Sequence, residues 1–358
     1  MKHGIAMIVS GFPRYSETFL LGELLALEEQ NLLAALFATK PGENGNVQPE
    51  IDRLLRKVQM VPSGTAAEQA AFVSAHLAGK NVAGIHGYFA HRPAEVAQLT
   101  ASALNVPFGF STHARDARKV EPSVLANRSK HASCVVACNS DVAKDIARVG
   151  GNVHLMPHGV DLKRFSPQSK KSSGVTRILA VGRLVEKKGF DVLIAAANHV
   201  QTPFTLTIVG DGPERTRLEN LVNINGLAHA VQFHEVVTHE HLPSLYAAAD
   251  IVVVPSVQDS QGDRDGLPNV VLEAMACGRP IIASDISAIG SAITHGSTGL
   301  LVAPGDPAAL AESIDLLATH DELRAALSKN ARAKIEQEFD VQHCATRFQR
   351  LMREVYAR

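Results

Sequence analysis

The chain has 358 residues, of which 46% are hydrophobic and 20% charged, and its formal net charge is -1. This composition is that of an ordinary globular protein, which excludes a disordered chain, and the length is typical of two domains. The balanced charge provides no overall field to attract nucleic acid, and no apolar run reaches the 18 residues that a membrane-spanning helix requires.

The N-terminus and the cysteines indicate the cellular compartment of the protein. Residues 1–12 contain a single Lys and a short apolar run, which predicts a first buried strand rather than a signal peptide. None of the cysteines forms a CxxC pair, which fits a reducing compartment. We therefore expect a cytoplasmic protein whose contact with a membrane is at most peripheral. The cysteines are Cys134, Cys138, Cys277 and Cys344.

Short apolar runs alternate with amphipathic segments along the chain. This alternation predicts βαβ units and parallel sheets, and the continuously apolar strands predict sheets that are covered on both faces. The predicted strands include 5–10, 33–38, 82–86, 134–138, 177–181, 205–209, 251–255 and 280–283, and the predicted helices include 16–29, 141–149, 190–199, 213–223 and 269–277.

A polar segment rich in Ser and Lys, at 167–175, separates two complete α/β runs. We predict an N-terminal domain over 1–168, a C-terminal domain over 169–340, and a terminal helix over 341–358 that packs back towards the first domain. The fold class is therefore α/β, with two doubly wound, Rossmann-like domains. Ligands bind such sheets outside the carboxyl ends of their strands, which predicts a cleft between the two domains.

The first half carries one candidate motif, FSTHARDA at 110–117. His113 follows a strand-like run and can donate a hydrogen bond to a ligand hydroxyl or to a developing charge, while Arg115 and Asp116 can orient a ligand. The alternative is a structural histidine, which is the default for any one of the sixteen in the chain. We expect His86 and His158 to be structural or to support such a site.

Two glycine turns follow strands in the second half. In GRLVEKKG (182–189), Arg183 and Lys188 flank a turn and can neutralise a diphosphate, although a solvated basic loop would look the same. In VGDGP (209–213), Gly212 and its neighbour Gly210 allow the backbone to approach a ligand closely.

The strongest motif is DRDGLPNVVLEAMACG at 263–278. Pro268 and Asn269 open a helix whose N-terminus suits a phosphate. Asp265 lies just before this helix and Glu273 about one turn inside it, so both carboxylates can accept hydrogen bonds from hydroxyls of one ligand. A capped, solvated helix is the alternative for this segment taken alone.

These motifs, in this order, resemble the family 4 (group 1) glycosyltransferases, which are retaining enzymes of the GT-B fold. The motifs that carry the resemblance are PHGVDLKRF at 157–165, GRLVEKKG at 182–189, VGDGP at 209–213, VPS at 254–256 and DGLPNVVLEAMACGRPII at 265–282. The resemblance extends over nearly the full chain. It implies a hexosyltransferase-type enzyme with an acceptor-binding first domain and a nucleotide-sugar donor-binding second domain.

The resemblance also implies the roles of individual residues. Arg183 and Lys188 would bind the donor diphosphate, Glu273 the ribose hydroxyls and Asp265 the donor sugar. Catalytic roles are implied for His113, Arg183, Lys188, Asp265 and Glu273; donor contacts for Gly11, Arg183, Lys188, Gly212, Asp265, Gly266, Leu267, Pro268, Asn269 and Glu273; and acceptor contacts for Arg14, Ser16, Glu17, His113, Arg115 and Asp116.

The sequence departs from the family pattern in two places. Asp265 stands where the family usually has the first Glu of an E-x7-E pattern, and Gly11-Phe12-Pro13 replaces the usual double glycine. Donor base and sugar are therefore left open. The segment FPRYSETFLLGEL at 12–24 resembles members associated with exopolysaccharide assembly.

Asp263 and Asp265 also form a DxD motif, which binds a divalent metal in the other glycosyltransferase fold. Because Arg183 and Lys188 already supply positive charge, we expect no metal and no cofactor. The expected partners are a UDP- or GDP-sugar and a saccharide or lipid-linked saccharide acceptor. Two alternatives stay open: a nucleotide-sugar-binding subunit of a polysaccharide assembly complex, and another GT-B activity such as an epimerase or a phosphorylase.

Overall fold

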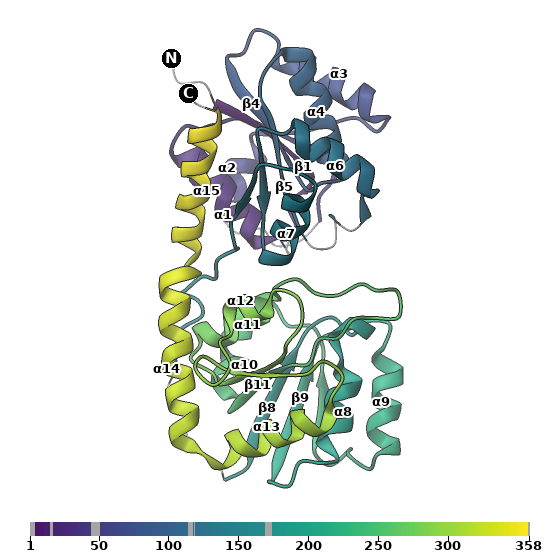
Figure 1. Cartoon of the computed structure of the whole chain (residues 1–358), viewed down its shortest axis with the longest axis vertical. Coiled ribbons are helices and arrows are strands. Elements are labelled where there is room, and N and C mark those ends of the chain that lie inside the picture. Colours follow the sequence, from purple (N-terminus) through teal and green to yellow (C-terminus); the bar gives the residue numbers. More distant parts are fainter. Residues whose placement is uncertain are drawn as a thin grey trace. The chain divides into compact units, whose positions relative to one another are not determined.

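The computed structural model describes residues 4–14, 17–43, 51–113, 117, 119–168 and 174–356. The chain divides into two compact units, Met1–Gly159 with Val341–Arg358, and Val160–Asp340 (Figure 1). No helix within the described ranges combines the length and the apolar character that crossing a bilayer demands.

The first unit is built on a parallel sheet with seven strands among the described residues, in the order β3-β2-β1-β4-β5-β6-β7. Every residue of the central strand β1 is buried, as expected for a strand covered on both faces. The strands are β1 (Gly4–Phe12), β2 (Leu33–Pro41), β3 (Val58–Met60), β4 (Val82–Tyr88), β5 (Phe108–Thr112), β6 (Cys134–Ala137) and β7 (Val153–Leu155).

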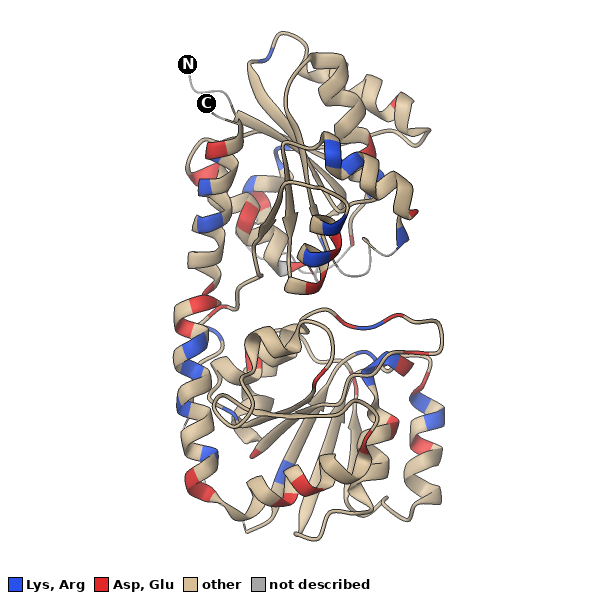
Figure 2. Cartoon of the chain, viewed as in Figure 1, with Lys and Arg blue, Asp and Glu red and all other residues tan. Residues whose placement is uncertain are grey.

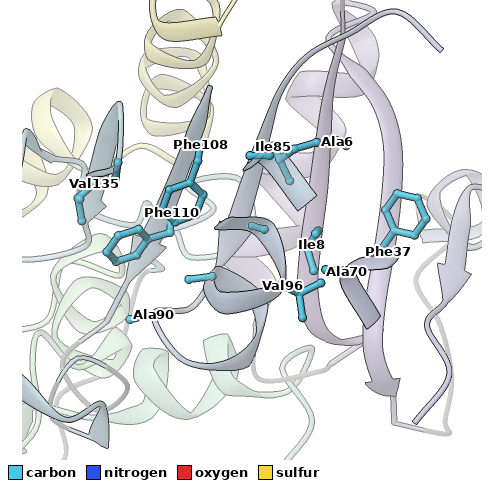
Figure 3. Packing of buried hydrophobic residues seen from close by; sticks show 14 of the residues in the cluster. Ala6, Ile8, Phe37, Ala70, Ile85, Ala90, Val96, Phe108, Phe110 and Val135 are labelled. Carbon is cyan, nitrogen blue, oxygen red and sulfur yellow. The ribbon is translucent and has the colours of Figure 1, made fainter. Parts of the chain in front are cut away.

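Helices cover both faces of this sheet. One apolar core joins the sheet to α3, α4, α6 and α7, and Figure 3 shows its side chains, among them Phe37, Ile85 and Phe110. A second core, on the other face, joins the sheet to α1, α2 and α15. The helices are α1 (Thr18–Glu29), α2 (Ile51–Leu55), α3 (Ala66–Leu77), α4 (Arg92–Leu104), α6 (Pro122–His131), α7 (Ser140–Arg148) and α15 (Val341–Tyr356).

The C-terminal helix α15 is part of the first unit. Phe348, Leu351 and Met352 are buried in the core that α15 shares with α1. Tyr356, near the end of the helix, lies within 2.9 Å of Nδ1 of the buried His86 through its hydroxyl. Burial lowers the pKa of His86 to about 3, so its ring is neutral. His86 therefore has a structural role, linking β4 to the last helix.

The second unit holds a parallel sheet with six strands in the described part, in the order β10-β9-β8-β11-β12-β13. Its strands are β8 (Thr176–Val181), β9 (Phe204–Val209), β10 (Val231–His234), β11 (Ile251–Val254), β12 (Ile281–Ser284) and β13 (Leu300–Val302). Its helices are the 3₁₀ helix η1 (Glu186–Lys188), α8 (Phe190–Ala197), α9 (Arg215–Ile224), α10 (Leu242–Ala248), α11 (Asn269–Ala276), α12 (Ile289–Ala292), α13 (Pro307–Thr319) and α14 (Asp321–Glu338).

Both sheets are doubly wound, as the alternation of runs predicts. One core of the second unit includes residues of α8, α9 and α13, and another includes residues of α10, α11, α12 and α14. Basic and acidic residues lie side by side along α9 and α14 (Figure 2), so charge is balanced locally on these helices as well as over the chain.

The structure differs from the sequence prediction at the domain boundary. The second unit begins at Val160 rather than at residue 169, because Val160 and Phe165 are buried in its core. Arg332 of α14 donates a hydrogen bond to the Phe165 carbonyl oxygen at 2.9 Å, which ties this stretch to the second unit. The predicted boundary at 167–175 therefore comes later in the sequence than the start of the second unit.

Four strands did not stand out in the sequence: β3, β7, β10 and β13. Each has three or four residues and forms an edge of its sheet. An edge strand pairs on one side only and is often very short, so it needs no long apolar run. The pattern of apolar residues therefore predicted the inner strands of both sheets and missed the edge strands.

The packing of α15 predicts that Phe348→Ala lowers the free energy of unfolding of the first unit by about 3–5 kcal/mol, because it removes a fully buried ring. Urea unfolding, monitored by far-ultraviolet circular dichroism, measures this change. Arg347→Ala, at an exposed position of the same helix, is the control and should change stability by less than about 0.5 kcal/mol. Equal, small effects of both variants would contradict the packing described for α15.

Candidate functional site

The turns that follow β8 and β9 pack against each other without side chains between them. Gly210 has a φ of +146°, and a Cβ atom there would overlap the Gly182 carbonyl oxygen. A Cβ at Gly212 would overlap the carbonyl oxygen of Leu184. Glycine at these positions is therefore a steric requirement of the two turns.

A pocket of about 370 Å³ opens where these turns meet. It lies at the carboxyl ends of β8 and β9, the edge at which open α/β sheets bind ligands. Its lining is apolar apart from backbone groups, Arg183 and Asp211, which suits a flat ring that is recognised partly by backbone atoms. The lining residues are Val181, Gly182, Arg183, Val209, Gly210, Asp211, Val236, Val237 and Leu242.

Lys188 connects this pocket to Asp265. The lysine lies at the end of η1, and a Cβ on Gly182 would come within 3.5 Å of its Cδ and Cε atoms, so its side chain runs beside the turn that lines the pocket. Its Nζ lies 2.7 Å from Oδ2 of Asp265. Ser256, which follows β11, donates a hydrogen bond to the same carboxylate oxygen at 3.1 Å.

Lys187 adds a second positive charge to this cluster. Its Nζ lies 3.0 Å from Oδ2 of Asp263 and 3.6 Å from Oδ1 of Asp265. The side chain of Asp265 is only 11% exposed, and each lysine side chain 18% exposed. Two lysines thus face the two carboxylates of the DxD motif in a partly shielded site, where charges interact more strongly than in open water.

Glu273 is buried on α11, with 5% of its surface exposed. Tyr246 of α10 donates a hydrogen bond to its Oε2 at 2.7 Å, and Nε2 of His239 lies 3.4 Å from Oε1. The pKa of Tyr246 is raised well above its usual value by burial and then by the Glu273 charge. Nη1 of Arg164 lies 2.8 Å from Nδ1 of His239, so it orients the ring through its second nitrogen. The carboxylate of Glu273 is therefore held in a fixed orientation.

The remaining donor residues predicted in the second unit lie between these groups. Gly266 to Asn269 join Asp265 to α11, whose N-cap is Pro268, and the described residues provide no side-chain cap for this helix end. Arg183 is exposed at the pocket mouth. Gly11, by contrast, belongs to the first unit, where it is buried near the end of β1.

The first unit places His113 directly after β5, among aromatic rings. Its Nε2 lies 2.9 Å from Nε2 of His158, so one ring donates a hydrogen bond to the other. Phe19 stacks on His158 with ring centroids 3.9 Å apart, and Phe89 lies 4.9 Å from His113. Burial lowers the pKa of His113 well below its usual value, and the nearby His158 and His91 lower it further. His113 is therefore a neutral imidazole at pH 7.

Of the predicted acceptor residues, Arg14 and Glu17 lie together. Nη1 of Arg14 is 3.5 Å from Oε1 of Glu17. Burial nevertheless raises the pKa of Glu17 to about 7, because desolvation outweighs the charge of Arg14. Ser16, Arg115 and Asp116 lie outside the described residues.

Several residues of these clusters were not predicted from the sequence. Lys187 and Ser256 sit inside motifs that the sequence does show, GRLVEKKG and VPS, and could have been found there. Tyr246 and His239 carry no local signal, because they reach Glu273 from 27 and 34 residues away by packing alone.

Residues 162–334 match the model of the family described as Glycosyl transferases group 1. WcaL of Escherichia coli (strain K12), a protein named for colanic acid biosynthesis, is 34% identical over 190 residues, which cover 51% of this chain and 47% of WcaL. The amylovoran biosynthesis glycosyltransferase AmsK of Erwinia amylovora is 35% identical over 174 residues, which cover 48% of this chain and 42% of AmsK. The chain thus spans about half the length of the curated relatives it matches.

The whole fold is similar to that of a solved structure. HepE of Anabaena, determined in complex with UDP, superposes with a TM-score of 0.82 over 98% of this chain and 100% of HepE, at 19% identity. The two doubly wound units are those of the GT-B fold. This agrees with the fold class that the motifs implied.

The nested turns predict a large difference between two glycines of the second unit. Gly210→Ala brings a Cβ onto the Gly182 carbonyl oxygen, so it should lower stability by more than about 2 kcal/mol and deform the pocket. Gly226 also has a positive φ, of +68°, but a Cβ there meets open space. Gly226→Ala should therefore lower the free energy of unfolding by only about 1–2 kcal/mol, which is the cost of placing an alanine in the left-handed conformation. Thermal unfolding of both variants measures the difference, and equal losses would refute the close approach.

Proposed function

We propose that the protein is a group 1 glycosyltransferase, the family whose model residues 162–334 match, and that it transfers a sugar from a nucleotide-diphosphate sugar to a hydroxyl of a saccharide acceptor. The names of AmsK and WcaL, which refer to exopolysaccharides, support a role in the synthesis of such a polymer. The acceptor is a saccharide or a lipid-linked saccharide.

The observation that supports this proposal is a continuous row of groups, which leads from the pocket through Lys188 to the carboxylates of Asp265 and Glu273. The side chain of Lys188 runs beside Gly182 of the pocket wall, where an added Cβ would meet it at 3.5 Å, and its Nζ is 2.7 Å from Asp265. Asp265 in turn leads through Gly266–Asn269 into α11 and Glu273. A nucleoside, a diphosphate and a sugar follow one another in the same order in a nucleotide-sugar donor.

Each part of the donor has a matching group along this path. The base enters the pocket beside Val236 and Val237 and meets mainly backbone atoms. The diphosphate lies across Gly182, where Lys188 and Arg183 neutralise it, Lys188 as a point charge and Arg183 as a fork. Glu273 retains lone pairs beyond those used by Tyr246 and His239, so it can accept hydrogen bonds from the ribose hydroxyls.

The reaction breaks the bond between the anomeric carbon and the diphosphate oxygen and forms a bond to the acceptor oxygen on the same face. The anomeric configuration is retained, and the acceptor proton passes to the departing phosphate. The chain's task is electrostatic: Lys188 and Arg183 stabilise the charge that grows on the diphosphate. When Lys188 turns to the diphosphate, Asp265 is released to contact hydroxyls of the donor sugar.

We assign His113, a residue of the first unit, to the sugar or the acceptor. Because its imidazole is neutral, it offers one N–H donor to a sugar or acceptor hydroxyl without placing a positive charge beside a developing oxocarbenium ion. Arg14 and Glu17 belong to the same unit as His113, and with it they form the acceptor side of the proposal.

A thermal-shift screen against UDP, GDP, ADP, TDP and the common nucleotide sugars tests the donor site. A ligand at 100 times its dissociation constant adds about 2.7 kcal/mol of stability. We expect one nucleotide to stabilise the protein, and transfer to saccharide acceptors with that donor to give a product of retained configuration. Donor binding without transfer would favour a binding subunit instead, and an epimerised or phosphorolysed product would favour another GT-B activity.

Lys188→Ala should reduce transfer by roughly 10²-fold or more, because the leaving diphosphate loses a preorganised charge, and Glu273→Ala should do the same through the ribose. Turnover is measured with the donor identified in the screen. Lys329→Ala, an exposed lysine of the same unit, is the matched control and should retain wild-type turnover. Near-normal rates in either site variant would refute the role assigned to that residue.

Transfer should also persist in the presence of EDTA, since two lysines face the DxD carboxylates and Arg183 adds a third positive charge nearby. The assay compares untreated enzyme with enzyme dialysed against the chelator. Complete loss of transfer that Mn²⁺ or Mg²⁺ restores would show that Asp263 and Asp265 hold a catalytic metal.

A further inference from the structure

The first unit places two further side chains that can bind a metal ion, Cys138 and His158, beside His113. His113, Cys138 and His158 offer two imidazole nitrogens and one sulfur, and these three atoms all lie within 4.8 Å of one another. Among the described residues, this is the one group of at least three such side chains close enough to share a metal ion.

We propose that His113, Cys138 and His158 form a binding site for a zinc-like divalent cation. The site involves only the first unit, so it stands whether or not the donor proposal for the second unit is correct.

The topology of the sheet brings the three residues together. β5, β6 and β7 are adjacent and parallel, and His113 and Cys138 follow β5 and β6 directly. The Cys138 N–H donates a hydrogen bond to the Thr112 carbonyl oxygen at 3.3 Å, which sets the two residues in register. His158 lies three residues beyond β7. Three neighbouring strands thus deliver their ligands to one edge of the sheet.

The chemistry of the ligands selects the ion. Two imidazoles and a thiolate are the donors that zinc prefers, and three protein ligands leave a fourth position open to water. Hard ions such as Mg²⁺ and Ca²⁺ prefer oxygen ligands and are not expected here.

The two imidazole nitrogens require only a small adjustment. With Zn–N bonds of about 2.0–2.1 Å, a tetrahedral ion holds its two nitrogens about 3.3 Å apart. The two Nε2 atoms now lie 2.9 Å apart and would separate by a few tenths of an ångström as the ion replaces their hydrogen bond. Phe19, stacked on His158, keeps the ring plane in place during this change.

The carboxylate of Glu23 lies near one of the proposed ligands, His158. Oε1 of Glu23 is 3.8 Å from Nδ1 of His158, the ring nitrogen that faces away from the proposed ion. Metal-binding histidines commonly direct their second nitrogen to a carboxylate, which orients the ring and strengthens the ligand. Asn139 holds the third ligand, because its Nδ2 lies 3.3 Å from Sγ of Cys138 while its Oδ1 caps α7.

An ion at this site would occupy His113, to which the proposed function gives a contact with sugar or acceptor. This consequence rests on the proposed function, whereas metal binding does not. Zinc is therefore expected to inhibit transfer by competing for His113.

Isothermal titration calorimetry of the full chain with Zn²⁺ tests the site. We expect one ion per chain and the release of about one proton per ion, because the Cys138 thiol must become a thiolate. Titration in two buffers of different ionisation enthalpy measures that proton. Substitution with Co²⁺ should produce a sulfur-to-cobalt charge-transfer band in the near ultraviolet.

Cys138→Ser should weaken zinc binding by more than about 100-fold and abolish the cobalt band, since losing even an outer partner of a ligand costs 10–100-fold. His229→Ala, an exposed histidine of the second unit, is the control and should bind zinc as the wild type does. Thermal unfolding without metal checks that the cysteine variant is folded, and Cys138→Ala provides a second substitution. Wild-type affinity in both folded cysteine variants would overturn the proposal.

The transfer assay tests the same site independently of the calorimetry. Zinc should lower the transfer rate of the wild type by a larger factor than that of Cys138→Ser, and equal inhibition of both would overturn the assignment. If no transfer is found with any donor, the proposed function fails while the calorimetry still decides the metal site.

Discussion

The close approach of backbone to backbone at Gly182 and Gly210 is the constraint on which the second unit's site depends. A side chain at Gly210 would hold the turns after β8 and β9 apart. Gly189, at a φ of +64°, brings the end of η1 equally close to the Pro255 carbonyl oxygen, after β11. Glycine is needed here for proximity as much as for conformation. Without these contacts, Lys188 would not reach Asp265.

Charge compensation is the second feature of that site. Lys187 and Lys188 face Asp263 and Asp265 in a partly shielded cluster, so each charge is stabilised by its opposite. A diphosphate brings negative charge that competes with Asp265 for Lys188. In the proposed function, binding a donor is therefore an exchange of partners rather than the filling of an empty positive site, and it would leave the carboxylate available for hydroxyls.

The first unit applies the same topological rule to different chemistry. Residues that follow β5, β6 and β7 meet at one sheet edge, where aromatic rings surround two histidines and a cysteine. The two proposals share His113, so acceptor recognition and metal binding would exclude each other at this side chain.

The sequence by itself determined the fold class and the interior of both sheets, because buried parallel strands must be continuously apolar and the helices between them amphipathic. It also made Lys188, Asp265 and Glu273 candidates for the donor site, since each lies in a contiguous strand-turn-helix motif whose chemistry is local. Only the tertiary structure decided the edge strands, the start of the second unit at Val160, and the partners of those residues. Tyr246 and His239 reach Glu273, and His158 reaches His113, across long stretches of chain. Such contacts follow from packing, and no spacing along the chain encodes them.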